Sequence, residues 1–140
     1  MVNKVTIVNY GSGNLLSVSR GLEHSGGTVV ITDNPDQVAA AERLVVPGVG
    51  AFAKAMQALL DRGLVEPIHR FIKTGRPFLG ICVGMQLMMD YSEEFGRHDG
   101  LGLIPGRVGI IPETAADGTP HPIPHIGWKR LLNGNANWKG

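Results

Sequence analysis

The chemically most suggestive residue of the 140-residue chain is its single cysteine, Cys82. It lies within Gly80-Ile81-Cys82-Val83-Gly84-Met85-Gln86, where a predicted strand meets a predicted helix. Glycines two residues to either side of a nucleophile are typical of a nucleophile elbow, a strained turn that presents the nucleophile above a sheet. A helix beginning just after the sulfur favours the thiolate, which is the attacking form. The alternative is that Cys82 is a small buried hydrophobe, the commoner fate of a free cysteine.

A second segment, Pro47-Gly48-Val49-Gly50, follows another predicted strand and could complement the cysteine. Acyl transfer needs N–H donors aimed at the oxyanion of the tetrahedral intermediate, each contributing about 2.7–4 kcal/mol. The amide of Val83, directly after the nucleophile, is one candidate donor, and the amide of Val49 or Gly50 is another. Taken alone, the segment is more simply an ordinary turn between a strand and a helix; beside Cys82, the oxyanion role is favoured.

The elements that would position these residues alternate along the chain. Short apolar runs predict strands at 5–8, 28–31, 44–46 and 77–81, and helical spacing predicts helices at 15–22, 36–41, 52–60, 64–73 and 83–89. This alternation predicts an α/β fold with a doubly wound, mostly parallel sheet. Ligands bind beyond the carboxyl ends of such strands, where the glycine-rich segments 10–14, 47–50 and 82–84 all fall.

Three local details follow from the same patterns. The strand at 77–81 is apolar throughout, which predicts burial on both faces of the sheet. The acidic residues Asp90, Glu93 and Glu94 are expected to form the solvated end of the helix at 83–89. A strand is predicted at 106–111, followed by a proline-broken extended segment to Trp128 and a loop or tail at 133–140.

Composition excludes several classes of protein. The hydrophobic fraction of 43% and charged fraction of 18% are those of a globular domain, and a net charge of +1 without clustered basic residues argues against nucleic-acid or membrane-surface binding. One cysteine permits no internal disulfide, and no apolar run reaches the roughly 20 residues of a membrane span. We therefore expect a cytoplasmic location.

No cofactor or metal is expected. The stretch Gly11-Ser12-Gly13 begins like a dinucleotide fingerprint but lacks the third glycine. His121 and His125 have a metal-like separation, but intervening prolines prevent the helix that would align them. The methionines at 85, 88 and 89 are expected to fill the core.

Four ordered segments resemble class I glutamine amidotransferases and, more narrowly, the glutaminase subunits of imidazole glycerol phosphate synthase. They are the opening loop Tyr10-Gly11-Ser12-Gly13-Asn14-Leu15, the Pro47–Phe52 loop, the Gly80–Gln86 elbow and Pro124-His125-Ile126-Gly127-Trp128. Together they cover nearly all of residues 3–130. The resemblance implies a flavodoxin-like fold in which residues 1–140 are the N-terminal portion of one glutamine amidotransferase domain.

The resemblance also implies a reaction. The Cys82 thiolate would attack the side-chain amide of glutamine to form a thioester and release ammonia, and water would then free glutamate. Gly48, Val49, Gly50 and the Val83 amide would hold the oxyanion, and Gln86 would help position the substrate.

The ammonia would pass to a separate cyclase subunit, a HisF-like (β/α)₈ barrel, within a heterodimer that serves histidine biosynthesis. The partner interface would comprise residues of the opening loop and of the last segment, namely Tyr10, Gly11, Gly13, Asn14, Pro124, Ile126 and Trp128.

One departure from the family pattern concerns the catalytic base. Family members continue past this length and carry a catalytic His-Pro-Glu sequence, whereas the histidines here, at 24, 69, 98, 121 and 125, all lack that context. We therefore expect the isolated chain to be inactive and to leave a sheet edge unpaired. Three hypotheses remain: a glutaminase subunit whose remaining part lies outside this sequence, a truncated non-catalytic binding module, and another class I glutaminase.

Overall fold

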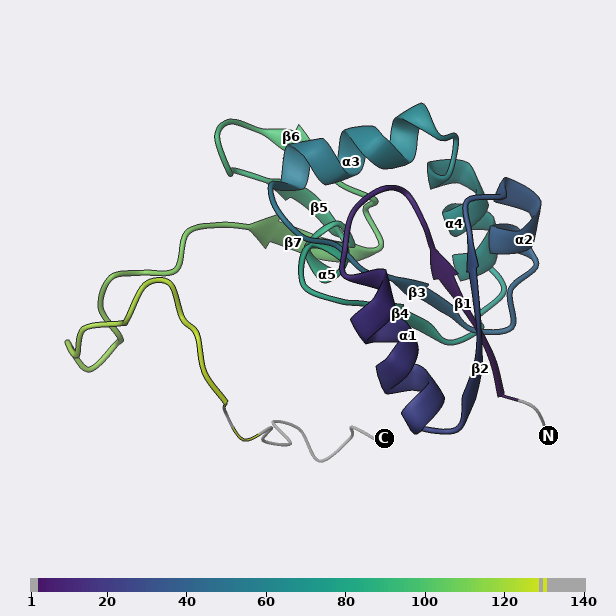
Figure 1. Ribbon diagram of the computed structural model, residues 1–140. Coiled ribbons are helices and arrows are strands. Elements are labelled where there is room, and N and C mark those ends of the chain that lie inside the picture. The colour runs from purple at the N-terminus through teal and green to yellow at the C-terminus, as the bar shows by residue number, and fades with distance from the viewer. Residues whose placement is uncertain (1–2, 129, 131–140) are drawn as a thin grey trace. The chain divides into compact units, whose positions relative to one another are not determined.

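A computed structural model describes residues 3–128 and residue 130, and divides the chain into two compact units, Met1–Gly109 and Ile110–Gly140. The first unit is built on a parallel sheet (Figure 1). Its strands lie in the order β2-β1-β3-β4, and they are β1 (Asn3–Val8), β2 (Gly27–Thr32), β3 (Leu44–Val46) and β4 (Phe78–Gly80). The predicted doubly wound parallel sheet is confirmed.

Helices cover both faces of this sheet. They are α1 (Leu15–His24), α2 (Pro35–Ala39), α3 (Phe52–Asp61) and α4 (Val65–Ile72). Alternating residues of β1 enter two separate cores: Val5 and Ile7 pack with α1, whereas Val8 joins the larger core with residues of the other three helices. Side-chain caps fix two helix starts, because Asn14 accepts from the Ser17 amide and Asn34 accepts from the amides of α2.

The prediction that the fourth strand is buried on both faces is wrong. Leu79 is 49% exposed, although its register partner Val45 on β3 is buried. Both side chains point to the face of the sheet on which α1 lies. Because α1 packs on β1 and not on β4, it covers Val45 but leaves Leu79 exposed. Among the described residues β4 pairs only with β3, so its other edge is open.

The predicted helix at 83–89 is a single turn, α5 (Val83–Gln86). The chain then forms a second, three-stranded sheet of β5 (Met89–Ser92), β6 (His98–Asp99) and β7 (Ile104–Val108), the last replacing the strand predicted at 106–111. The acidic residues are therefore not a helix end, and Asp90 accepts a hydrogen bond of 2.9 Å from the Gly106 amide. A short apolar run cannot by itself distinguish helix from strand, and here the partner strands decided.

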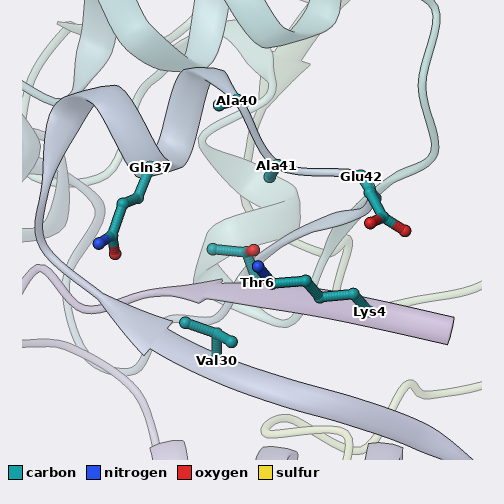
Figure 2. A pocket seen from close by; sticks show the side chains of 7 residues that line it. All are labelled: Lys4, Thr6, Val30, Gln37, Ala40, Ala41 and Glu42. Atoms are coloured by element: carbon teal, nitrogen blue, oxygen red, sulfur yellow. The ribbon is translucent and has the colours of Figure 1, made fainter. Parts of the chain in front are cut away.

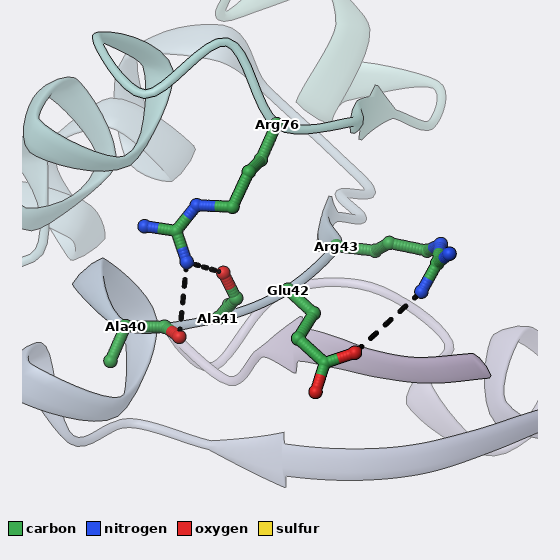
Figure 3. Close-up of polar contacts among 5 residues, drawn as sticks. All are labelled: Ala40, Ala41, Glu42, Arg43 and Arg76. Atoms are coloured by element: carbon green, nitrogen blue, oxygen red, sulfur yellow. Dashed lines mark hydrogen bonds and ion pairs between the residues drawn. The ribbon is translucent and has the colours of Figure 1, made fainter. Parts of the chain in front are cut away.

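Arg76, just before β4, anchors the end of α2 (Figure 3). Its guanidinium donates to the carbonyls of Ala39 and Ala40 at 3.3 and 3.2 Å and also to the Ala41 carbonyl. The same group lies 5.2 Å from the ring centre of Phe71. One planar cation thus satisfies carbonyls that the end of a helix leaves without partners.

The described part of the second unit, Ile110–Trp128 with Arg130, contains little regular structure. A bridge pairs Thr114 with Pro120 around a turn. Hydrogen bonds from the Thr119 side chain and amide hold the pKa of the Asp117 carboxyl below its usual value. The predicted loop at 133–140 lies outside the described residues. No helix in the described part of the chain is long and apolar enough to cross a membrane.

Candidate functional site

Cys82 occupies the junction between β4 and α5 in a strained conformation. Its φ of 55° and ψ of −118° lie in a region that residues with a side chain rarely adopt. The turn is fixed to β3 because the Ile81 amide donates to the Val46 carbonyl at 3.0 Å. Cys82 is exposed, so it is not the buried hydrophobe that was the alternative. The backbone geometry is that of the predicted elbow.

Both flanking glycines are required by close backbone approach. A Cβ on Gly84 would overlap the Val46 carbonyl oxygen, and a Cβ on Gly80 would lie 2.7 Å from Met85 Cα. Neither position can therefore hold another residue without moving the backbone. This is the physical reason for the spacing that the sequence shows around Cys82.

The loop at 47–50 lies directly against the elbow. A Cβ on Gly48 would be 2.8 Å from the Gly84 nitrogen and 3.0 Å from Val83 Cβ. Two segments that are more than thirty residues apart in the sequence are thereby joined at the carboxyl ends of β3 and β4. This is the juxtaposition that an oxyanion site beside Cys82 needs.

The candidate oxyanion donors differ in their present hydrogen bonds. The Val49 amide donates to Ser12 Oγ at 3.0 Å, and the Ser12 hydroxyl lies 3.0 Å from the Val49 carbonyl oxygen. The Val49 amide must therefore leave Ser12 before it can bind an oxyanion. Among the described residues of the first unit, the Val83 amide at the start of α5 has no hydrogen-bond acceptor. Gly50 has a φ of 88°, and because glycine is conformationally free its peptide can reorient.

The opening loop lies partly inside the fold. The Tyr10 side chain is fully buried, and its hydroxyl donates to the Pro47 carbonyl at 2.5 Å. Burial and the nearby charge of Cys82 raise the pKa of Tyr10, although a hydrogen bond with Ser12 opposes this. Gly13 packs on Pro47, since a Cβ there would lie 2.9 Å from Pro47 Cβ.

The remaining predicted interface residues are more exposed. Gly11 and Asn14 are exposed in the first unit, where a Cβ on Gly11 would lie 3.1 Å from an Arg62 nitrogen. Pro124, Ile126 and Trp128 belong to the second unit and are exposed, and the Trp128 side chain is fully so.

Two further residues bear on the site. Gln86 is close to Cys82 in the sequence, and Glu94 contacts the chain just after the loop at 47–50. Gln86 ends α5, one turn after Cys82, and is half-buried. Glu94 was not predicted as a site residue, yet its carboxylate accepts from the Phe52 amide at 2.8 Å. Because Ala51 offers no side-chain cap to α3, Glu94 caps this helix and fixes the chain just after the loop at 47–50. No sequence pattern links Glu94 to Phe52, because the contact is between distant segments.

A separate pocket of about 230 Å³ lies beside β1, β2 and α2 (Figure 2). Lys4 and Thr6 of β1, Val30 of β2 and Gln37 of α2 line it, together with residues 40–42. No residue of the elbow or of the loop at 47–50 belongs to this lining. Among the described residues, no three histidine, cysteine or acidic side chains are grouped to hold a metal ion.

Comparisons with known proteins concern the chain as a whole. Residues 6–136 match the family model of the class I glutamine amidotransferases. The chain is 48% identical over 132 residues to imidazole glycerol phosphate synthase subunit HisH 1 of Legionella pneumophila (strain Lens), covering 94% of this chain and 62% of the relative. It is 50% identical over 131 residues to subunit HisH of Geobacter sulfurreducens, covering 93% and 63%. The chain thus spans less than two thirds of the length of these relatives.

Among solved structures, the chain resembles a protein assigned as a peptidase E from Listeria monocytogenes EGD-e. The TM-score is 0.58 at 18% identity, over 73% of this chain and 63% of the other. At this identity the likeness concerns the fold alone.

Proposed function

The chain belongs to the class I glutamine amidotransferase family, and on that premise we propose that it is the glutaminase part of an imidazole glycerol phosphate synthase. The observation that carries the proposal is the exposed, strained Cys82 between two obligatory glycines, with the loop at 47–50 packed against it. The identity to HisH subunits supports the narrower assignment.

In the proposed reaction, the Cys82 thiolate attacks the side-chain amide carbon of glutamine. The carbonyl π electrons move to oxygen, and the resulting oxyanion accepts hydrogen bonds from the Val83 amide and from the loop at 48–50. Collapse re-forms the carbonyl and breaks the C–N bond, and the nitrogen leaves as ammonia after it gains a proton. Water then cleaves the thioester, which releases glutamate and returns the thiol.

This proposal requires two changes at the site. The Val49 amide must exchange its bond to Ser12 for one to the oxyanion, or the Gly50 peptide must take that role. A base must also take the thiol proton and give it to the leaving nitrogen. Within the first unit, no histidine ring hydrogen-bonds the Cys82 sulfur, and the sequence has no His-Pro-Glu segment to supply one.

The partner and the compartment belong to the same proposal. The ammonia would pass to a cyclase subunit that is a (β/α)₈ barrel, with the exposed Gly11 and Asn14 and the segment Pro124–Trp128 at the interface. The HisH names of the relatives, which describe subunits of a synthase, support a partner. An exposed catalytic thiol favours a reducing compartment, so we place the protein in the cytoplasm.

The test is labelling of Cys82 by a glutamine-derived chloroketone. Because such a reagent offers the thiolate a carbonyl as well as the glutamine backbone, we expect adduct formation at Cys82 that free glutamine slows and free asparagine does not. Mass spectrometry of the digested protein locates the adduct, and Cys82→Ala is the control. Labelling no faster than that of a free cysteine, without protection by glutamine, would contradict the proposal.

The alternative is a non-catalytic binding module that docks on a partner. Both hypotheses predict that the 140-residue chain alone releases negligible ammonia from glutamine. They differ in the labelling experiment, because a module that only docks on a partner needs no glutamine-selective thiol.

A further inference from the structure

Tyr10 has no role in the steps above, although it is the bulkiest of the fully buried side chains. A phenol hydroxyl removed from water needs a hydrogen-bond partner. The partner of Tyr10 is the Pro47 carbonyl, 2.5 Å away and thirty-seven positions along the chain. This bond connects the end of β1 to the first residue of the loop beside Cys82.

The same hydroxyl lies under the next residue of that loop. A Cβ on Gly48 would be 2.6 Å from Tyr10 Oη and 2.8 Å from the Gly84 nitrogen. The phenol and the elbow therefore both lie close to the position that a Cβ on Gly48 would occupy. A shift of the Tyr10 hydroxyl would move the loop relative to the elbow.

We infer that Tyr10 is a positioning residue for the oxyanion site, because its hydroxyl donates to the Pro47 carbonyl and thereby holds the Pro47–Gly48 backbone against the elbow at Cys82. The inference rests on the proposed function of Cys82 and assigns Tyr10 to the interior of the site instead of to a partner surface. Tyr10 touches no reacting atom and acts through the loop.

The electrostatic setting keeps the phenol in its donor form. Burial and the charge of the Cys82 thiolate both disfavour a phenolate, so the hydroxyl remains protonated and can donate to Pro47. A side chain that could not donate would leave the Pro47 carbonyl without this partner.

The test is Tyr10→Phe, which keeps the ring and removes one oxygen. We compare the rates at which the full chain reacts with a glutamine-derived chloroketone and with iodoacetamide. The chloroketone forms an oxyanion at its carbonyl, whereas iodoacetamide is attacked at a saturated carbon and needs no oxyanion donor. We expect the chloroketone rate to fall about tenfold and the iodoacetamide rate to change less than about twofold.

Tyr91→Phe is the matched control, because it makes the same change on β5, where Tyr91 stacks under Arg97, and we expect neither rate to change. If Tyr10→Phe left both rates unchanged or lowered both equally, the positioning role would be overturned. If the unmodified chain itself showed no glutamine-protected preference for the chloroketone, the proposed function would fail instead.

A second measurement applies if Tyr10→Phe does not fold. The chain has two tyrosines, so incorporation of 3-fluorotyrosine into the Tyr91→Phe chain alters Tyr10 alone. The more acidic phenol changes the strength of the bond to Pro47, so the ratio of chloroketone to iodoacetamide rates must change by more than about twofold. An unchanged ratio would again overturn the positioning role.

Discussion

At Cys82 the chain holds a left-handed backbone conformation that costs about 1–3 kcal/mol in a residue with a side chain. The conformation persists because the residues on both sides of Cys82 are fixed to β3. Gly84 lies against the Val46 carbonyl, and the Ile81 amide donates to the same carbonyl. The backbone of Cys82 is strained because its neighbours are closely packed, and in this conformation the cysteine is exposed instead of buried in the core.

Gly84→Ala should break the elbow, because the added methyl would overlap the Val46 carbonyl oxygen. We expect a loss of at least about 3 kcal/mol in the free energy of unfolding, measured by urea denaturation. Gly21→Ala is the matched control, since Gly21 lies within α1 with no atom within 4 Å of an added Cβ. That change should stabilise the protein by about 0.5–1 kcal/mol. Equal effects of the two substitutions would refute the packing argument.

Tyr10 predicts how stability depends on pH in the alkaline range. Its pKa is raised in the folded state above the ordinary tyrosine value of 10.0, because burial disfavours the phenolate. Above about pH 10 the unfolded chain loses this proton first, so the stabilisation present below that pH is lost as the pH rises through the folded pKa. Urea denaturation from pH 8 to 11 should therefore show a steeper loss for the parent chain than for Tyr10→Phe. Parallel curves would contradict the assignment.

At the scale of elements, the connection from α2 to β3 depends on a single cation supplied by a later segment. Arg76 donates to the carbonyls of Ala40 and Ala41 (Figure 3). It also donates to the preceding carbonyl of Ala39, and its flat guanidinium lies over Phe71 of α4. The contact ties the start of β4 to the start of β3, its neighbour in the sheet. It thereby aligns the two strands whose ends form the elbow and the loop at 47–50.

Arg76→Lys should destabilise the chain by about 1–2 kcal/mol, because one ammonium group cannot reach three carbonyls in a plane. Thermal or urea unfolding provides the measurement. Arg70→Lys is the comparison, since Arg70 forms an exposed ion pair with Glu66 at 2.8 Å, and such pairs contribute at most about 0.5 kcal/mol. A loss at position 70 as large as that at position 76 would contradict the capping role.

For the whole molecule, the main consequence of the fold is the open edge of β4. Among the described residues Phe78–Gly80 pairs on one side only, and the half-exposed Leu79 points to the same face as α1 but is not covered by it. An apolar strand with unpaired backbone groups favours pairing with other chains. We therefore expect the 140-residue chain to self-associate at high concentration.

Leu79→Lys should reduce this association, because a charge on an edge strand opposes pairing. Size-exclusion chromatography with light scattering across a concentration series measures it. Leu60→Lys is the control, since Leu60 is 52% exposed but lies on helix α3 and not on a strand. Association that both substitutions reduce equally would indicate general hydrophobic contact instead of edge pairing, and a monomer at all concentrations would refute the prediction.

The local sequence by itself determined the parallel sheet, the strand and helix alternation, and the elbow around Cys82. These depend on period, on β-branched runs and on glycine spacing, all of which act between residues close in sequence. The short helix α5 and the strand β5 were not determined in this way, because Val83–Met89 suits either structure and the pairing with β6 and β7 decided.

The tertiary structure alone decided which groups meet around the cysteine. The bond from Tyr10 to Pro47, the engagement of the Val49 amide by Ser12 and the cap that Glu94 provides to α3 all join segments at least thirty-seven residues apart. Such contacts depend on the order and register of the strands, which bring distant segments together at one edge of the sheet. No local pattern predicts these contacts, so the sequence could propose Cys82 as a nucleophile but could not predict the groups that hold its surroundings in place.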